Sequence, residues 1–93
     1  MPKLHLMPTH LNWLMQNNSL TKTFHFASFE QAMEFMQTAA AGISRMNHHP
    51  EWCNVYNRVD VTLRTHDAGN TVTNKDHELA EWLDKVYQPF TQP

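Results

Sequence analysis

The sequence predicts an α+β domain, in which helices pack on one face of a small antiparallel sheet. Residues 59–65 alternate between apolar and polar side chains, which is typical of a strand with one buried face. Residues 28–48 and 73–88 place apolar side chains three and four positions apart, which is typical of helices that cover such a sheet. The 93 residues are expected to form one domain, with an N-terminal segment at 1–18 and a core at 19–88.

Composition argues against several classes of protein. The chain has no apolar run long enough for a transmembrane helix, and its beginning lacks the apolar region of a signal peptide. A net charge of −2 with scattered basic residues argues against a nucleic-acid surface. The single cysteine, Cys53, excludes an intrachain disulfide and a thiol-rich metal motif, so a reducing, cytoplasmic setting is expected.

The first elements are expected to be a short helix and a strand. Residues 9–16 are predicted to be helical because Thr9 is a candidate N-cap and apolar side chains follow at helical spacing. Those apolar positions are Leu11, Leu14 and Met15. Residues 20–26 are predicted to be a strand, since Phe24 and Phe26 share one parity in a stretch rich in threonine and phenylalanine.

A long helix follows. Ser28 and Gln31 have the spacing of a capping box, which predicts the start of the helix. The helix must stop before His49 and Pro50, because the residue before a proline disfavours helical backbone angles. Its predicted apolar stripe consists of Phe29, Met33, Met36, Ala40 and Ile43, with Ala32 and Ala39 beside it. Phe35 lies off this stripe and is expected either to widen the apolar face or to meet another subunit.

The second half of the chain is predicted to form a β-hairpin and a last helix. Residues 52–56 and 59–65 are the two strands. The helix is expected to start at Thr73, with the carboxylate of Asp76 close to its positive N-terminal end, and to stop at Pro89. Its predicted buried positions are Leu79, Leu83 and Val86.

Three histidines mark a candidate acid–base site. His48 and His49 are adjacent at the junction between the long helix and a strand, where Pro50 restricts the backbone. His66 ends the neighbouring strand, before a turn at 67–70, so it can meet the histidine pair at one end of the sheet. Histidine exchanges a proton near neutral pH without special tuning, so this pattern indicates proton-transfer chemistry.

The motif His-His-Pro-Glu-Trp-x-Asn-x-Tyr at 48–56, followed by Leu-x-Thr-His at 63–66 and Thr-x-x-Asp at 73–76, resembles the pterin-4a-carbinolamine dehydratase family. The resemblance covers roughly residues 20–87. It implies a four-stranded antiparallel sheet with helices on one side, assembled as a homodimer or homotetramer. It also implies a hydro-lyase, 4a-hydroxytetrahydrobiopterin dehydratase, which converts 4a-hydroxytetrahydropterin to quinonoid dihydropterin and water in tetrahydrobiopterin recycling. The expected partner is then a small pterin substrate, with no metal, organic cofactor, nucleic acid or membrane involved.

The resemblance also implies roles for individual residues. The family's three active-site histidines, which are expected to share general acid and base duty, correspond to His48, His49 and His66. Pro50 is expected to set the geometry of the histidine pair, and Trp52 matches an aromatic beside the pterin pocket. Asp76 matches a carboxylate of the same region, although it could equally be only a charge at a helix N-terminus. Ser44 stands where family members often carry a glutamate.

Two other functions are possible from the sequence. His48, His49 and His66 could bind zinc, although adjacent histidines on an extended junction point to opposite sides, which makes a shared metal awkward. The family resemblance also implies a second role, since some members act as non-enzymatic dimerisation partners that stabilise a transcription factor. That role would use a surface around Phe35 and Ala39. The remaining histidines lack a motif and are expected at the surface or the edge of the core; they are His5, His10, His25 and His77.

Overall fold

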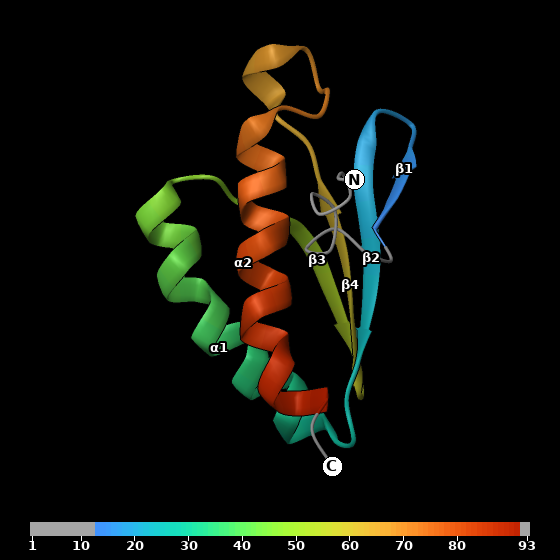
Figure 1. The fold of residues 1–93 in the computed structure, drawn as a ribbon. Coiled ribbons are helices and arrows are strands. Elements are labelled where there is room, and N and C mark those ends of the chain that lie inside the picture. Colours follow the sequence, from blue (N-terminus) through green and yellow to red (C-terminus); the bar gives the residue numbers. More distant parts are fainter. Residues whose placement is uncertain (1–12, 92–93) are drawn as a thin grey trace, which may run out of the picture.

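The computed structural model describes residues 13–91, which form a four-stranded sheet and two long helices. The elements follow in the order β1 (Leu14–Gln16), β2 (Ser19–His25), α1 (Phe29–Met46), β3 (Glu51–Val55), β4 (Arg58–Leu63), a short 3-10 helix (His66–Ala68) and α2 (Asn74–Thr91). All neighbouring strands are antiparallel, in the sheet order β1-β2-β4-β3. Both helices lie on the same side of the sheet (Figure 1), which confirms the predicted fold class. Within residues 13–91, no helix is long and apolar enough to cross a membrane.

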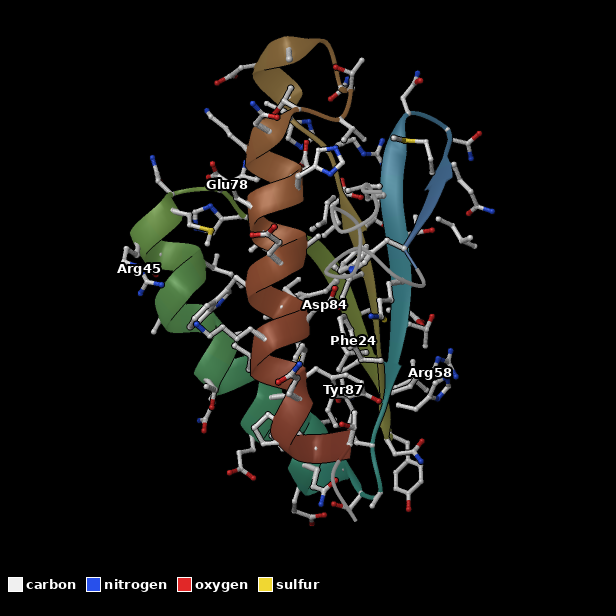
Figure 2. The ribbon with its side chains drawn as sticks, viewed as in Figure 1. Phe24, Arg45, Arg58, Glu78, Asp84 and Tyr87 are labelled. Atoms are coloured by element: carbon white, nitrogen blue, oxygen red, sulfur yellow. The ribbon has the colours of Figure 1, made fainter. Side chains whose placement is uncertain are left out.

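The central strands β2 and β4 turn one set of side chains toward the helices. Phe24 pairs with Val59 and Leu20 with Leu63, and each of these side chains is at most 5% exposed. Figure 2 shows Phe24 and Tyr87 pointing into the layer between the sheet and α2, where their ring centroids lie 4.8 Å apart. A fully buried apolar side chain of this size contributes about 1.5–3 kcal/mol, so this layer is the main source of stability.

The opposite face of the sheet is polar, as the alternation along β4 predicts. The Thr23 hydroxyl donates to Oδ1 of Asp60 at 2.8 Å, and Arg58 Nε donates to Oδ2 of the same carboxylate at 3.2 Å. The bond from Thr23 and, after it, the bond and charge of Arg58 hold the pKa of Asp60 below its usual value. These contacts link β2 to β4 on the outer face.

The predicted N-terminal helix is wrong in the part that the structure describes. Thr9 and Leu11 lie outside the described residues, whereas Leu14–Gln16 form β1 and pair with β2. Asn17 and Asn18 have φ angles of 50° and 61°, so they form a tight turn that closes a β-hairpin. Asparagine enters this left-handed region more readily than most residues, and the turn therefore overrides the helical spacing of the nearby apolar residues.

Helix α1 begins and ends as predicted but turns a different side to the core. Ser28 Oγ accepts the N–H of Gln31 at 3.2 Å, Gln31 Oε1 accepts that of Ala27 at 3.2 Å, and Asn47 closes the helix with φ of 53°. The predicted stripe is wrong in phase, because Ile43 is the only one of its five members that is buried. The buried positions are Ala32, Phe35, Ala39, Gly42 and Ile43.

Phe35 explains the rotation of α1. Its side chain is fully buried, and its ring centroid lies 4.9 Å from that of Phe24 and 5.2 Å from that of Phe26. Burying this one large ring against two others stabilises the helix more than burying the methionines of the predicted stripe. Phe35 is therefore part of the core, which confirms the first of its two predicted roles, widening the apolar face of the helix, and contradicts the second, contact with another subunit.

Helix α2 begins directly after Thr73 as predicted, but it does not end at Pro89. The proline lies in the last turn, and the helix continues to Thr91. A proline removes one backbone hydrogen bond, which matters less in a terminal turn than in a helix interior. Phe90 packs edge-on against Phe26, with centroids 5.4 Å apart, so ring packing holds this turn in place.

The two helices approach closely at Gly42. The Trp82 indole lies so near that a Cβ at position 42 would overlap the ring, and Trp82 Nε1 donates to the carbonyl of Ala39 at 3.0 Å. We predict that Gly42→Ala lowers the free energy of unfolding by about 1–3 kcal/mol, because it overpacks this contact. Alanine would otherwise stabilise a helix interior by about 1 kcal/mol over glycine. Chemical denaturation measures the difference.

The exposed Ala41 beside it provides the control. Ala41→Gly should lose only the propensity term of about 1 kcal/mol. A Gly42→Ala variant at least as stable as the unmodified chain would contradict the close packing of Gly42 and Trp82.

Candidate active site

A pocket of about 170 Å³ lies at the end of the sheet where the α1–β3 connection, the loop after β4 and the first turn of α2 converge. Its lining residues are Asn47, His48, His49, Arg64, Thr65, His66, Asp67 and Lys75. The three histidines singled out in the sequence thus share one pocket, although 18 positions separate the first from the last (66 − 48 = 18). Their catalytic roles stay predictions.

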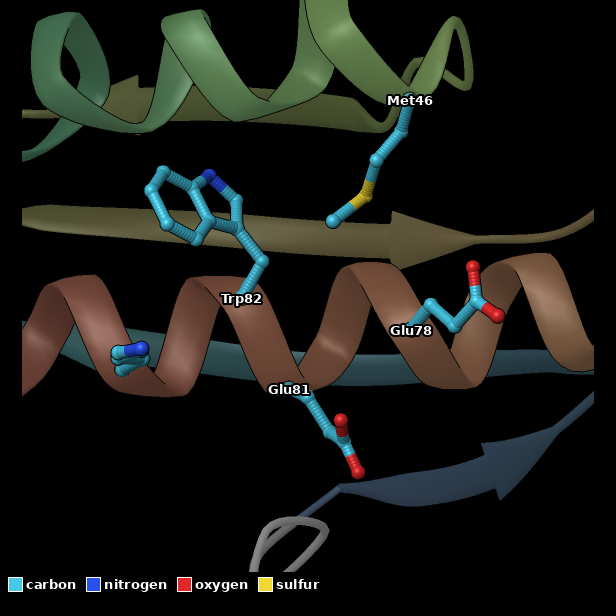
Figure 3. A pocket seen from close by; sticks show the side chains of 5 residues that line it. Met46, Glu78, Glu81 and Trp82 are labelled. Atoms are coloured by element: carbon cyan, nitrogen blue, oxygen red, sulfur yellow. The ribbon is translucent and has the colours of Figure 1, made fainter.

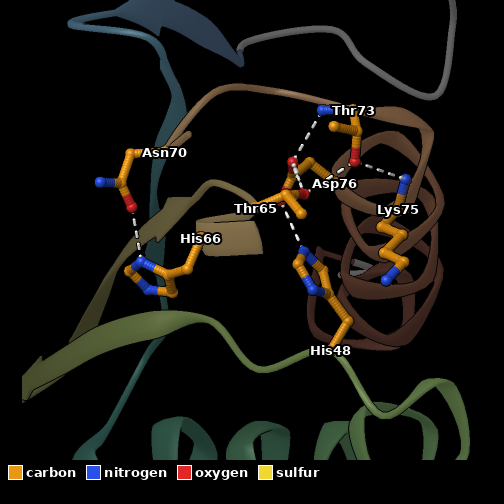
Figure 4. A network of polar contacts seen from close by, with 7 residues as sticks. All are labelled: His48, Thr65, His66, Asn70, Thr73, Lys75 and Asp76. Carbon is orange, nitrogen blue, oxygen red and sulfur yellow. Dashed lines mark hydrogen bonds and ion pairs between the residues drawn. The ribbon is translucent and has the colours of Figure 1, made fainter. Parts of the chain in front are cut away.

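The carboxylate of Asp76 holds this end of the molecule together. Asp76 is fully buried, and its Oδ1 lies 2.7 Å from Nε2 of His48 (Figure 4). Its Oδ2 accepts the Thr65 hydroxyl at 2.7 Å and the backbone N–H of Thr73 at 2.9 Å. Both alternative interpretations of Asp76 agree with the geometry. Asp76 caps the start of α2 and contacts one of the three candidate histidines, but it does not itself line the pocket.

This network determines which ring nitrogen of His48 carries a proton. A carboxylate can only accept hydrogen bonds, so Nε2 of His48 donates, and in the neutral ring the lone pair is then on Nδ1. Thr65 already donates to Asp76, so its oxygen accepts from the Thr73 hydroxyl at 2.7 Å. Thr73 Oγ1 in turn accepts the N–H of Lys75 at 3.3 Å. Each hydroxyl therefore has one donor and one acceptor role, and the ring of His48 is fixed by a fully partnered network.

His66 is held by a residue that the sequence analysis treated only as part of a turn. Strand β4 ends at Leu63, and His66 is the exposed first residue of the short 3-10 helix. Its Nδ1 lies 2.6 Å from Oδ1 of Asn70. Asn70 has φ of 60° and follows Gly69, which has φ of 81°. The sequence signal for this contact was an asparagine in a turn, four positions after a histidine.

The other predicted site residues lie near the pocket without lining it. Pro50 connects His49 to β3, and Trp52 lies on β3 opposite Val61, half-buried against the core. Ser44 is exposed in the last turn of α1, where its carbonyl accepts the N–H of the helix cap. The roles expected for Pro50 and Trp52 stay predictions.

Two cations at the pocket were not anticipated from the sequence. Arg64 and Lys75 both line it, and Arg64 Nη2 forms an ion pair with Glu51 Oε1 at 3.3 Å.

No group of three or more histidine, cysteine or acidic side chains within residues 13–91 could hold a metal ion, so the zinc alternative gains no support there. Among the remaining histidines, His25 is exposed on β2, and His5 and His10 lie outside the described residues.

A second, larger pocket of about 300 Å³ lies between α1 and α2 (Figure 3). It is lined by Met46, Glu78, Glu81, Trp82 and Lys85. This pocket has no histidine among its lining residues, so the smaller pocket is the better candidate for proton transfer near neutral pH.

Comparisons with known proteins identify related chains. A family model described as pterin 4 alpha carbinolamine dehydratase matches residues 3–86. A protein of Opitutus terrae, provisionally named pterin-4-alpha-carbinolamine dehydratase, is 53% identical over 74 residues, which are 80% of this chain and 76% of the relative. A protein of Rhizobium johnstonii with the same provisional name is 54% identical over 69 residues, which are 74% of this chain and 67% of the relative.

Two solved structures share the fold. One, described as a transcriptional coactivator/pterin dehydratase from Brucella melitensis, is 40% identical, with a TM-score of 0.77 and coverage of 82% of each chain. The other is a pterin dehydratase-like protein described as a RuBisCO assembly factor in the alpha-carboxysome. It is 23% identical, with a TM-score of 0.71 and coverage of 85% of this chain and 93% of that chain, and it shows a likeness of fold alone.

The buried carboxylate makes a test of the network possible. We predict that Asp76→Asn lowers the free energy of unfolding by about 1–3 kcal/mol. The amide of asparagine has an NH₂ group in place of one carboxylate oxygen. This donor would face other donors, either those of Thr65 and Thr73 or the N–H of His48, and a hydrogen bond would be lost. Chemical denaturation of the variant at neutral pH measures this loss.

Asp67→Asn is the matched control, because Asp67 lines the same pocket but is exposed. Its stability should stay within about 0.5 kcal/mol of the unmodified chain. Equal stabilities for the Asp76 and Asp67 variants would contradict the role of Asp76 as the acceptor that joins three segments.

Proposed function

Because this chain belongs to the pterin-4a-carbinolamine dehydratase family, we propose that it dehydrates 4a-hydroxytetrahydropterins by histidine acid–base catalysis. The C4a–O bond breaks, and the hydroxyl leaves as water after it gains a proton. N5 loses its proton, and a C4a=N5 double bond forms in the quinonoid dihydropterin product. The observation that carries this proposal is the single pocket lined by His48, His49 and His66.

The hydrogen bonds of the site support this chemistry. One group must give a proton to the hydroxyl while another takes a proton from N5. In neutral His48 the Asp76 contact places the lone pair on Nδ1, which suits a base, and His49 and His66 are two further proton carriers that line the same pocket. Acid–base groups positioned in this way contribute typically about 10²–10⁴-fold to a rate.

No metal or organic cofactor is required in the proposed mechanism, because every step apart from the loss of water is a proton transfer. The proposed place of the reaction is tetrahydrobiopterin recycling, after an aromatic amino-acid hydroxylase has released the 4a-hydroxy compound. The alternative of a dimerisation partner loses its predicted surface, since Phe35 and Ala39 are both fully buried in the core of the chain itself.

We also propose that the chain forms a homodimer or a homotetramer, as the family resemblance implies. Large apolar side chains are exposed on β1 and at the end of β3, the two edge strands of the sheet. They are Leu14, Met15, Val55 and Tyr56, with exposures of 44–67%. Apolar groups on unpaired edge strands favour association with another chain.

Light scattering coupled to size-exclusion chromatography tests this proposal. At micromolar concentrations we expect a mass of two or four times the 10.9 kDa of one chain. A mass of a single chain that does not change with concentration would contradict it.

Dehydratase activity is tested with 4a-hydroxytetrahydropterin generated in the assay and with the absorbance of the product as the readout. We expect His48→Ala to lower kcat/KM by about 10²-fold or more, because it removes both the proton carrier and the partner of a buried carboxylate. His25→Ala is the control, since His25 is exposed on β2 away from the pocket, and its activity should stay close to that of the unmodified chain. The proposal would be contradicted if the chain failed to accelerate the reaction, or if the His48→Ala variant kept full activity.

A further inference from the structure

We propose that Asn70 is a positioning residue that holds His66 in the tautomer with the proton on Nδ1. Nε2 is then the ring atom of His66 that can accept a proton at the pocket. The consequence for catalysis rests on the proposed dehydratase function, whereas the tautomer itself can be measured without any substrate.

The first argument for this proposal is the contact between the side chains of His66 and Asn70. Nδ1 of His66 lies 2.6 Å from Oδ1 of Asn70, which is a short distance for a hydrogen bond between nitrogen and oxygen. An amide oxygen can only accept, so Nδ1 must carry the hydrogen. A neutral histidine side chain in water prefers the opposite tautomer, with the hydrogen on Nε2. The Asn70 amide therefore selects a form that the ring would not favour by itself.

The loop that carries both residues is closed on itself, which keeps the amide in place. The N–H of Thr65 donates to the carbonyl of Thr71 at 2.8 Å, and the N–H of Asn70 donates back to the carbonyl of Thr65 at 3.1 Å. Gly69 closes the 3-10 helix with a bond from its N–H to the carbonyl of His66 at 3.1 Å. These backbone bonds fix the main chain at positions 66 and 70 before a substrate binds, so that the ring of His66 and the amide of Asn70 start from a constant spacing.

Asn70 complements the role of Asp76 at the other histidine. His48 is held through Nε2 and keeps a lone pair on Nδ1, whereas His66 is held through Nδ1 and keeps a lone pair on Nε2. The nitrogen that can accept a proton is therefore Nδ1 in His48, close to the backbone, and Nε2 in His66, at the far end of the ring. Two proton carriers with different reach suit a reaction that moves protons at two separate atoms, the C4a hydroxyl and N5.

A purely structural role for Asn70 is the competing explanation. Its φ of 60° lies in the left-handed region, which asparagine tolerates better than most residues, so the turn alone could require it. Two substitutions separate the roles. Asn70→Gly keeps the backbone conformation and removes the amide. Asn70→Asp keeps an acceptor oxygen for Nδ1.

The test is a long-range ¹H–¹⁵N NMR correlation of the ¹⁵N-histidine-labelled chain without pterin, at a pH of about 8.5, where a typical imidazole is neutral. The spectrum distinguishes protonated from unprotonated ring nitrogens, and His66→Ala identifies the His66 signals. We expect Nδ1–H for His66 in the unmodified chain and in Asn70→Asp. We expect Nε2–H, or a mixture of both forms, in Asn70→Gly.

Activity provides the second readout. We expect Asn70→Gly to lower kcat/KM by roughly tenfold, as the loss of one proton-transfer alignment should. Asn18→Gly is the matched control, because Asn18 has φ of 61° in the β1–β2 turn, and it should change neither the His66 tautomer nor the activity.

Three results would overturn the proposal: Nε2–H for His66 in the unmodified chain, an unchanged tautomer in Asn70→Gly, or a changed tautomer with unchanged kcat/KM. If the unmodified chain has no dehydratase activity, the proposed function fails. The NMR result would still decide whether Asn70 sets the tautomer.

Discussion

The buried carboxylate of Asp76 is the constraint on which the candidate site depends. An ionised group without contact to water is strongly unfavourable unless donors surround it. Its donors lie in three connecting segments: His48 after α1, Thr65 after β4 and Thr73 directly before α2. The carboxylate is satisfied only when these three segments converge, and the pocket lies where they do. The position of the site thus follows from the need to solvate one charge with protein groups.

The rest of the core is arranged so that this end of the molecule can be polar. The aromatic rings that join the sheet to the helices gather around Phe35, toward the start of α1 and the end of α2. At the other end of α1, the small side chains of Ala39 and Gly42 allow α2 to come close through Trp82. Away from the pocket, burial of apolar surface therefore holds the sheet and the helices together. The residues around the pocket can then be polar and form hydrogen bonds.

The sequence predicted those features that depend on local chemistry. The alternation along β4 and the Ser28 capping box were confirmed because each depends on a few neighbouring residues. The helical prediction for residues 14–16 was wrong because these residues pair with β2 across the left-handed Asn17–Asn18 turn. The predicted phase of α1 was wrong because the burial of Phe35 against other rings of the core decided it. In the same way, the histidine motif was visible in the sequence, whereas the hydrogen bond from His66 to Asn70 requires a loop geometry that no spacing rule predicts.

The architecture alone does not decide what a chain of this fold does. A protein described as a RuBisCO assembly factor shares the fold with a TM-score of 0.71 at 23% identity, so the arrangement of sheet and helices does not by itself determine activity. Catalysis requires histidines whose protonated nitrogens are defined by their neighbours. In this chain a carboxylate defines one ring and an amide defines another, at 2.7 Å and 2.6 Å. Replacing Asn70 should alter the proposed proton transfer more than it alters the fold, so a change of one neighbouring side chain can change function within one fold.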